Sequence, residues 1–198
     1  MPSVSMVAGP NGSGKTTLIR HLIANGIKLG EYINPDDIAA DLSGPYDDRV
    51  REAQRMADDM REACLARRAS FTFETVMSHL SKVEFFARAT AAGFESVLYY
   101  VSTGDAALNV ARVAQRVRSG GHDVPEERIL SRFDRSLEYL PAALRVADRA
   151  FIYENSGPSG MVLGLTKDTT RQPDGSFRAS YVLTDGAPDW IRTLYEGV

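Results

Sequence analysis

The chain is poor in cysteine, in histidine and in long apolar runs, and each shortage excludes a class of protein. Cys64 is the one cysteine among 198 residues, so no internal disulfide can form and a reducing compartment is favoured. The three histidines show no metal-ligand spacing, so no zinc site is predicted. No apolar stretch approaches the roughly 20 residues that span a bilayer, and the apolar start SVSMVAG lacks the basic flank of a signal peptide. We expect a cytoplasmic protein with no membrane partner.

An excess of positive charge is also missing. The 23 lysines and arginines are outnumbered by 26 acidic residues, which gives a formal net charge of -3. General nucleic-acid binders carry a basic excess, so no nucleic-acid partner is expected. The length and the 43% hydrophobic content suit one core, and residues 1–198 are predicted to form a single domain.

Strand and helix patterns alternate along the first 155 residues. The run SVLYYV at 96–101 has no polar alternation, which is typical of a strand covered on both faces in a parallel sheet. Strands are expected at 3–8, 31–34, 71–73, 96–101 and 150–153, and helices at 15–24, 47–69, 80–92, 105–119 and 125–146. Residues 161–165 and 177–183 flank a Pro-Asp-Gly turn and predict a C-terminal hairpin, followed by a helix at 189–195. The pattern predicts an α/β sandwich with a mostly parallel central sheet.

The stretch GPNGSGKTT, residues 9–17, satisfies the phosphate-binding pattern Gly-x4-Gly-Lys-Thr between a predicted strand and a predicted helix. Its glycines let backbone N–H groups surround phosphate oxygens at the positive end of a helix. Lys15 is expected to reach the β- and γ-phosphates, and the Thr16 hydroxyl to ligate Mg²⁺. No guanine-specific motif is present, which favours ATP. The expected nucleotide-binding residues are Gly9, Asn11, Gly12, Ser13, Gly14, Lys15, Thr16 and Thr17.

Carboxylates follow the second and third predicted strands, where ligands bind in an open parallel sheet. Asp36 is the candidate general base, and Asp37 is the next choice. Asp37 is also a candidate for binding the acceptor. Alternatively, one of the two caps the helical turn DDIAADL. Glu74, followed by Thr75, is expected to bind acceptor hydroxyls or hold Mg²⁺ through water, unless Glu74 serves as a helix cap or an internal ion-pair partner.

An arginine-rich segment at about 112–136 is predicted to form a helical lid. Arg112 and Arg116 share one helix face, and the pair Gly120-Gly121 then breaks the helix. In the next helix an arginine stripe lies on a different face from an apolar stripe. Guanidinium groups are planar and permanently charged, which suits them to bind a phosphoryl group during its transfer. The arginine stripe is Arg128, Arg132 and Arg135, and the apolar one is Ile129, Phe133, Leu137 and Leu140. His122 either contacts the acceptor or caps a turn.

The segments GPNGSGKTT, INPDDIA, FTFET, RVRSGGHDVPEERILSRFDRSL and IYENS, in this order, resemble the zeta-toxin family of P-loop kinases. The resemblance covers about residues 3–156 and is strongest to a small branch with a GGHxVP lid segment. It implies a P-loop kinase-like sandwich with a helical arginine lid. Family members phosphorylate the sugar 3′-hydroxyl of UDP-N-acetylglucosamine with ATP, as the toxin half of a toxin–antitoxin pair.

The resemblance also implies roles for single residues. Lys15 would bind phosphate, Asp36 would be the base and Glu74 would lie on the acceptor side. The lid arginines would be Arg135, with Arg132 and Arg116. The family usually carries an arginine close before the proline of the lid segment, where His122 stands here. The resemblance thus implies an ATP- and Mg²⁺-dependent kinase whose acceptor is a small molecule such as a nucleotide sugar, with an antitoxin as protein partner.

The alternative is a nucleotide-binding regulatory module, or a P-loop NTPase without a small-molecule acceptor. Such proteins usually carry an aspartate at the end of a second core strand, whereas SVLYYVS ends in Ser102 and Thr103. Asn155, at the end of IYENS, either lies near the purine edge or shapes a turn. The compact set of base, acceptor-side carboxylate and arginine lid favours the kinase.

Overall fold

Residues 1–120 and 123–197, which the computed structural model describes, contain one sheet of seven strands in the order β2-β3-β1-β4-β5-β6-β7. The first five strands in the chain are parallel, and the last two are antiparallel. The predicted mostly parallel α/β fold is therefore confirmed. The strands are β1 (Ser3–Ala8), β2 (Glu31–Ile33), β3 (Phe71–Thr75), β4 (Glu95–Ser102), β5 (Arg149–Glu154), β6 (Val162–Arg171) and β7 (Phe177–Leu183).

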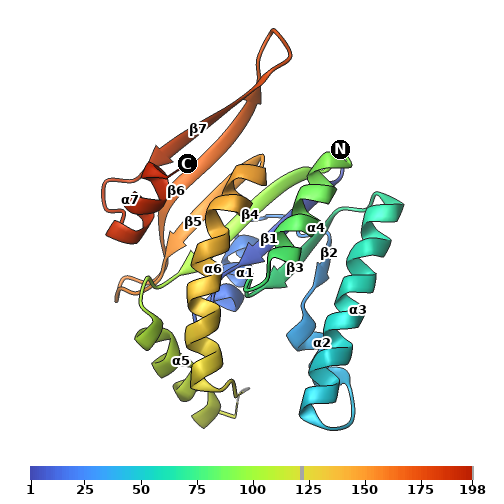
Figure 1. The fold of residues 1–198 in the computed structure, drawn as a ribbon, viewed down its shortest axis with the longest axis vertical. Helices are drawn as coiled ribbons and strands as arrows, with labels where there is room; N and C mark the ends of the chain where they lie inside the picture. Colours follow the sequence, from blue (N-terminus) through green and yellow to red (C-terminus); the bar gives the residue numbers. More distant parts are fainter. Residues whose placement is uncertain (121–122, 198) are drawn as a thin grey trace.

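Helices cover both faces of this sheet (Figure 1). The larger core lies on the side of α3, α4, α6 and α7, and a smaller one lies under α1. A cluster of phenylalanines fills the larger core, with Phe73 packed edge-on against Phe85 at 5.7 Å between ring centroids. The helices are α1 (Lys15–Ala24), α2 (Pro35–Asp41), α3 (Tyr46–Arg67), α4 (Leu80–Ala91), α5 (Ala106–Arg118), α6 (Glu126–Val146) and α7 (Asp189–Glu196).

The central strands explain why the sequence folds as a parallel sheet. β1 lies between β3 and β4, and from Val4 onward each of its residues is buried. β4 is buried from Ser96 to its last residue, as its uninterrupted apolar run predicts. Because β1 ends in the middle of the sheet, the loop that follows it is placed between the ends of its two neighbours.

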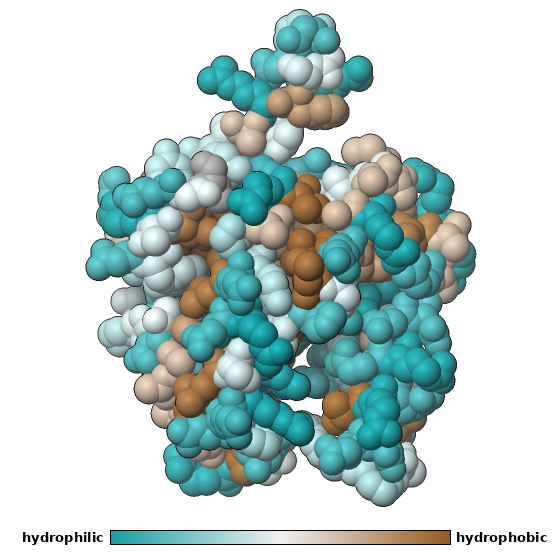
Figure 2. Space-filling model, viewed as in Figure 1, coloured by the Kyte–Doolittle hydropathy of each residue, from teal (hydrophilic) through white to brown (hydrophobic). Residues whose placement is uncertain are grey.

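The C-terminal hairpin is longer than its sequence pattern suggests. β6 runs to Arg171 rather than ending at Leu165, because it pairs with β5 as far as Asp168 and its last three residues continue on β7 alone. The turn forms at the predicted Pro-Asp-Gly, where Asp174 accepts hydrogen bonds from the backbone and the hydroxyl of Ser176. The tip projects beyond the body of the molecule (Figures 1 and 2). Across the described residues, no helix is both long and apolar enough to cross a membrane.

Candidate active site

The glycine-rich loop joins β1 to α1 in a conformation that requires glycine. Gly12 has φ +76, and a Cβ there would lie 2.7 Å from the carbonyl oxygen of Asn109. Gly14 has φ +108, and its Cβ would lie 2.4 Å from Nδ2 of Asn155. A side chain at either position would be strained and would also push against a neighbour. The loop is therefore held closely against the start of α5 and the end of β5.

Asn155 fixes this loop directly. Its Nδ2 donates a 2.7 Å hydrogen bond to the carbonyl oxygen of Ser13, and its own backbone N–H bonds to Ser102. The sequence suggested two roles for Asn155, a place near the purine edge or in a turn, and the structure adds a third, the support of the phosphate loop. The partner is 142 residues away in the chain, so local sequence carried no sign of the contact.

Lys15 is half-buried against the loop that it follows. Its Nζ donates hydrogen bonds to the carbonyl oxygens of Gly9, at 2.9 Å, and Pro10, at 3.1 Å. Burial lowers the pKa of Lys15, while the nearby carboxylates of Glu74 and Asp36 oppose that shift. The hydroxyl of Ser13 is also buried and has no partner among the described residues. A buried donor without a partner is costly, so this loop suits a ligand whose oxygens can accept hydrogen bonds.

A cleft of about 270 Å³ opens beside the loop. It lies between α2 and α3 on one side and α5 and α6 on the other, and Figure 2 shows the notch at the bottom of the molecule. Residues that are far apart in the sequence meet on its walls. The predicted site residues that line it are Asn11, Lys15, Asp36, Glu74, Thr75, Arg116 and Arg132.

Asp36 occupies the cleft wall without acting as a helix cap. The cap of α2 is Asn34, whose side chain accepts a 3.0 Å hydrogen bond from the backbone N–H of Asp36. Pro35 at the first helical position completes this start. The alternative in which Asp36 or Asp37 caps the turn is therefore wrong. Asp37 is exposed and does not line the cleft.

Glu74 belongs to β3 itself, which extends to Thr75 and not only to Phe73 as predicted. Its side chain is buried, and Oε2 accepts a 2.9 Å hydrogen bond from the hydroxyl of Tyr32 on β2. Burial raises the pKa of Glu74, and the charge of Lys15 partly opposes this. The partner, Tyr32, was not singled out from the sequence. Its only signal was its place two residues before Asn34 at the end of a strand.

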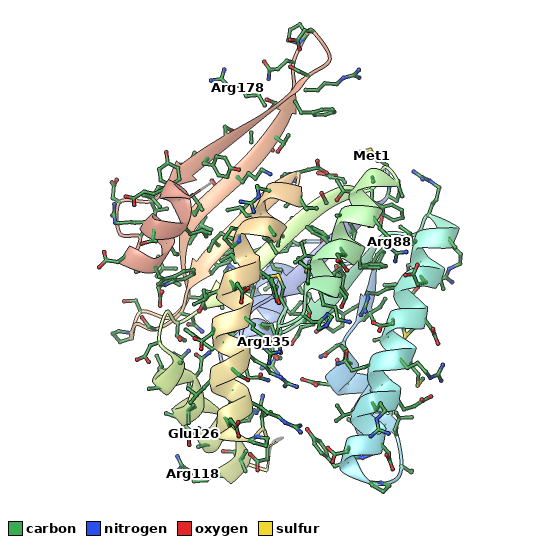
Figure 3. The ribbon with its side chains drawn as sticks, in the orientation of Figure 1. Met1, Arg88, Arg118, Glu126, Arg135 and Arg178 are labelled. Carbon is green, nitrogen blue, oxygen red and sulfur yellow. The ribbon has the colours of Figure 1, made fainter. Side chains whose placement is uncertain are left out.

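The arginines of α5 and α6 divide into two groups. Arg116 and Arg132, two of the arginines expected in the lid, line the cleft, and Arg128 joins them. Arg135 does not line it. Its Nε donates a 3.0 Å hydrogen bond to the carbonyl oxygen of Ser131 on its own helix (Figure 3 labels Arg135 on α6). His122 and Gly121 lie outside the described residues, so the roles predicted for them stay predictions.

Two further cations, Arg61 on α3 and Lys82 on α4, also line the cleft and were missed in the sequence. A signal for Arg61 was present, since it lies on the helical stripe of Ala53, Ala57 and Cys64, all of them buried. A charged residue in an apolar stripe is unusual unless it has a partner.

The described residues contain no group of three or more His, Cys, Asp or Glu side chains placed to hold a metal ion. Mg²⁺ at nucleotide sites usually takes one or two protein oxygens and fills its other positions with phosphates and water. Thr16, exposed at the start of α1, can supply such an oxygen. The site therefore fits a magnesium–nucleotide complex.

A strand, a glycine loop around a half-buried lysine, a helix and a cleft at the carboxyl ends of parallel strands define a P-loop protein of kinase-like fold. The chain belongs to the family described as AAA domain, which residues 4–140 match. An uncharacterized protein of Haemophilus influenzae (strain Rd) is 30% identical over 127 residues, which are 63% of this chain and 88% of that protein.

Solved structures share the fold at low sequence identity. The structure of AvrRxo1-ORF1:AvrRxo1-ORF2 with sulphate ions superposes over 100% of this chain with a TM-score of 0.71 at 14% identity, and a second structure of that pair contains ATP. This chain covers 63% of that protein's length. The PezAT toxin–antitoxin system of Streptococcus pneumoniae gives a TM-score of 0.57 at 16% identity, over 78% of this chain and 68% of the other.

Proposed function

We propose that the protein is an ATP-dependent phosphotransferase that moves the γ-phosphoryl group to a hydroxyl of a small molecule. One observation carries this proposal. A single cleft joins the phosphate-loop lysine, two carboxylates from neighbouring strand ends and arginines from the helices opposite. An NTPase without an acceptor has no need of a walled space beside the phosphate site.

Each group has a role in this reaction. Backbone N–H groups of the glycine loop, Ser13 and Lys15 hold the β- and γ-phosphates, and Thr16 holds the magnesium ion that offsets their charge. Asp36 accepts the proton of the attacking hydroxyl, as a general base within reach of the acceptor does. Glu74, fixed by Tyr32, orients the acceptor.

Guanidinium groups from the opposite wall stabilise the charge that develops on the transferring group. The zeta-toxin resemblance names Arg116, Arg132 and Arg135 for this role. The cleft geometry favours Arg116 and Arg132 together with Arg128. Burial lowers the pKa of Arg132, and the carboxylate of Asp36 opposes that shift. Asp36 and Arg132 are therefore close enough to interact electrostatically.

A nucleotide sugar such as UDP-N-acetylglucosamine is the proposed acceptor, with Asp37, Glu74, Thr75 and His122 on the acceptor side. We further propose a zeta-toxin-like kinase that acts in the cytoplasm and has an antitoxin as protein partner. The likeness to the PezAT and AvrRxo1 structures supports this proposal, since the first comes from a toxin–antitoxin system and the second is a structure of two proteins, AvrRxo1-ORF1 and AvrRxo1-ORF2. A single domain over residues 1–198 is part of the same proposal.

The test is a transfer assay on a metabolite extract with ATP labelled at the γ-phosphate. The wild-type protein should place the label on a small molecule, and Lys15→Ala should abolish this because the γ-phosphate loses its main positive contact. Label that appears only as inorganic phosphate would support the NTPase alternative. Near-normal transfer by Lys15→Ala would show that the loop is not the catalytic site.

A further inference from the structure

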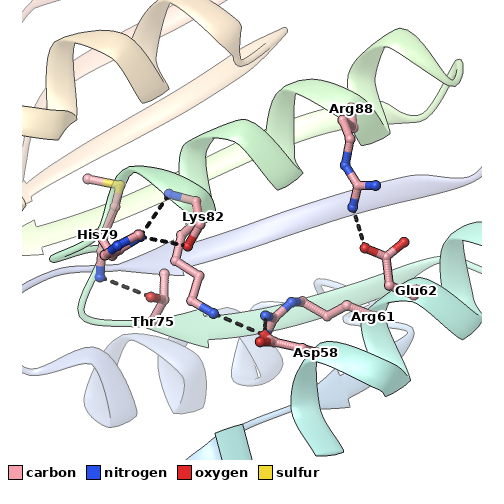
Figure 4. A network of polar contacts seen from close by, with 9 residues as sticks. Asp58, Arg61, Glu62, Thr75, His79, Lys82 and Arg88 are labelled. Atoms are coloured by element: carbon pink, nitrogen blue, oxygen red, sulfur yellow. Dashed lines mark hydrogen bonds and ion pairs between the residues drawn. The ribbon is translucent and has the colours of Figure 1, made fainter. Parts of the chain in front are cut away.

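A pair of cations joins α3 to α4 where the main cleft meets a second cavity that no phosphate-loop residue lines. Arg61 and Lys82 line the main cleft and also a second cavity of about 340 Å³. The other residues of the second cavity all belong to α3 and α4. Figure 4 shows the two side chains reaching toward each other from the two helices and meeting at Asp58. The pair therefore lies where an acceptor would extend beyond the reacting hydroxyl.

Arg61 has more hydrogen-bonding capacity than the protein uses. Its side chain is only 4% exposed, and its guanidinium lies over the rings of Phe73 and Phe85, at 5.3 and 5.4 Å from their centroids. One terminal nitrogen pairs with Asp58, while Nε is buried and has no partner among the described residues. A guanidinium presents five N–H donors in a plane, and these contacts leave several of them for another acceptor.

The two cations of the pair also share one carboxylate partner. Nζ of Lys82 lies 3.0 Å from the same Asp58 oxygen that pairs with Arg61, so one carboxylate serves two cations. The adjacent Glu62 is paired with Arg88. Burial lowers the pKa of Arg61 to about 10 and that of Lys82 to about 8, and the charge of Arg61 adds to the effect on Lys82. An anion between them would relieve this repulsion.

We propose that Arg61 and Lys82 form a subsite for a phosphate group carried by the acceptor, so the substrate class is phosphorylated hydroxyl compounds. The planar fork of an arginine and the compact charge of a lysine together suit a tetrahedral dianion. Asp36 and Glu74 line the same cleft, which lets one molecule place its hydroxyl at the base and its phosphate at this pair. The assignment of a substrate rests on the proposed kinase function, but the anion subsite does not.

The first experiment needs no catalysis. The protein is saturated with a non-hydrolysable ATP analogue and Mg²⁺, which fills the phosphate loop, and inorganic sulfate is then titrated while the amide NMR signals of α3 and α4 are followed. Lys82→Met should weaken sulfate binding by at least about tenfold, the scale of one lost charge-assisted contact. Lys82→Arg should keep most of it. Arg88→Met is the matched control, because Arg88 lines only the second cavity and pairs with Glu62.

The pH dependence gives a second readout, since sulfate stays dianionic. Wild-type binding should weaken as the pH rises through about 8, where Lys82 loses its proton, and Lys82→Arg should stay flat over this range. The charged and titratable groups around Lys82 are Asp58, Arg61 and Glu62 on α3, and His79, Glu84 and Arg88 at or on α4. Among these groups it is Lys82 whose pKa is lowered to about 8, so the weakening is assigned to Lys82.

Binding that Lys82→Met leaves unchanged, or that Arg88→Met weakens equally, would overturn the subsite, as would the absence of sulfate binding. If sulfate binds as expected, labelled transfer to anion-exchange fractions of the extract then tests the substrate class. Acceptor activity should be retained on the exchanger at neutral pH, and Lys82→Met should raise the acceptor KM while the KM for ATP stays the same. Failure of the kinase proposal would look different, because the label would then appear only as inorganic phosphate, whether or not sulfate binds.

Discussion

Removing the side chain of Asn155 tests whether the phosphate loop is held from a distance. In Asn155→Ala the carbonyl of Ser13, a fully buried residue, loses its donor. A lost neutral hydrogen bond that leaves a buried group unpaired costs about 1–3 kcal/mol. In a protein of this size each kcal/mol lowers Tm by about 2–4 °C. We therefore expect a fall of several degrees in calorimetry, together with an ATP Kd about tenfold higher because the loop is less often in its binding conformation.

Asn25→Ala is the matched control for this change. Asn25 also donates from Nδ2 to a backbone carbonyl, that of His21 at 2.8 Å, but it is exposed at the far end of α1. Asn25→Ala should leave ATP binding unchanged. Asn155 also occupies the space that a Cβ at Gly14 would need, so the losses in Gly14→Ala and Asn155→Ala should not add. Unchanged Tm and Kd in Asn155→Ala would refute the supporting role.

The remaining predictions concern the cleft. Asp36→Asn should lower kcat by at least about 10²-fold, the scale of lost general-base help, while a binding assay shows unchanged ATP affinity. If Asp37→Asn alone shows this loss, Asp37 is the base. Arg132→Ala should lower kcat more than it weakens ATP binding, and more than Arg135→Ala does, since only Arg132 lines the cleft; the reverse order in steady-state kinetics would favour the assignment by resemblance. Glu74→Gln should abolish transfer yet raise Tm near neutral pH. Burial raises the pKa of Glu74, so folding is opposed by its charge above the unfolded-state pKa, and the difference in Tm should vanish at pH values below that pKa, where the carboxyl is protonated in both states.

Much of this molecule could be predicted from the sequence because the informative signals are local. The glycine loop has a fixed pattern, and the apolar run of β4 shows its burial on both faces without any knowledge of its neighbours. The positions of Asp36 and Glu74 followed from their places at strand ends, since parallel strands end at one edge of a sheet.

The rest depends on contacts between distant segments. The support of Ser13 by Asn155 joins residues far apart in the chain, and so does the pairing of Glu74 with Tyr32, so neither partner can be read from a local stretch. The absence of Arg135 from the cleft wall goes with a side chain that bonds back to Ser131 on its own helix, which spacing alone does not fix. β3 also runs two residues beyond its apolar pattern, because parallel pairing of Glu74 and Thr75 with β1 continues the ladder.

The projecting hairpin offers a place to attach a label to the molecule. From Thr169 to Arg171, β6 pairs with β7 and no longer with β5, so the tip is a ribbon of two strands whose loss exposes nothing of the core. Two-stranded ribbons open easily, and exposed tips accept added sequence better than any other part of a domain. A reporter peptide or fluorophore attached between Gln172 and Ser176 would therefore lie at the end of the molecule remote from the cleft (Figure 1). Ligand binding could then be followed without altering the binding site.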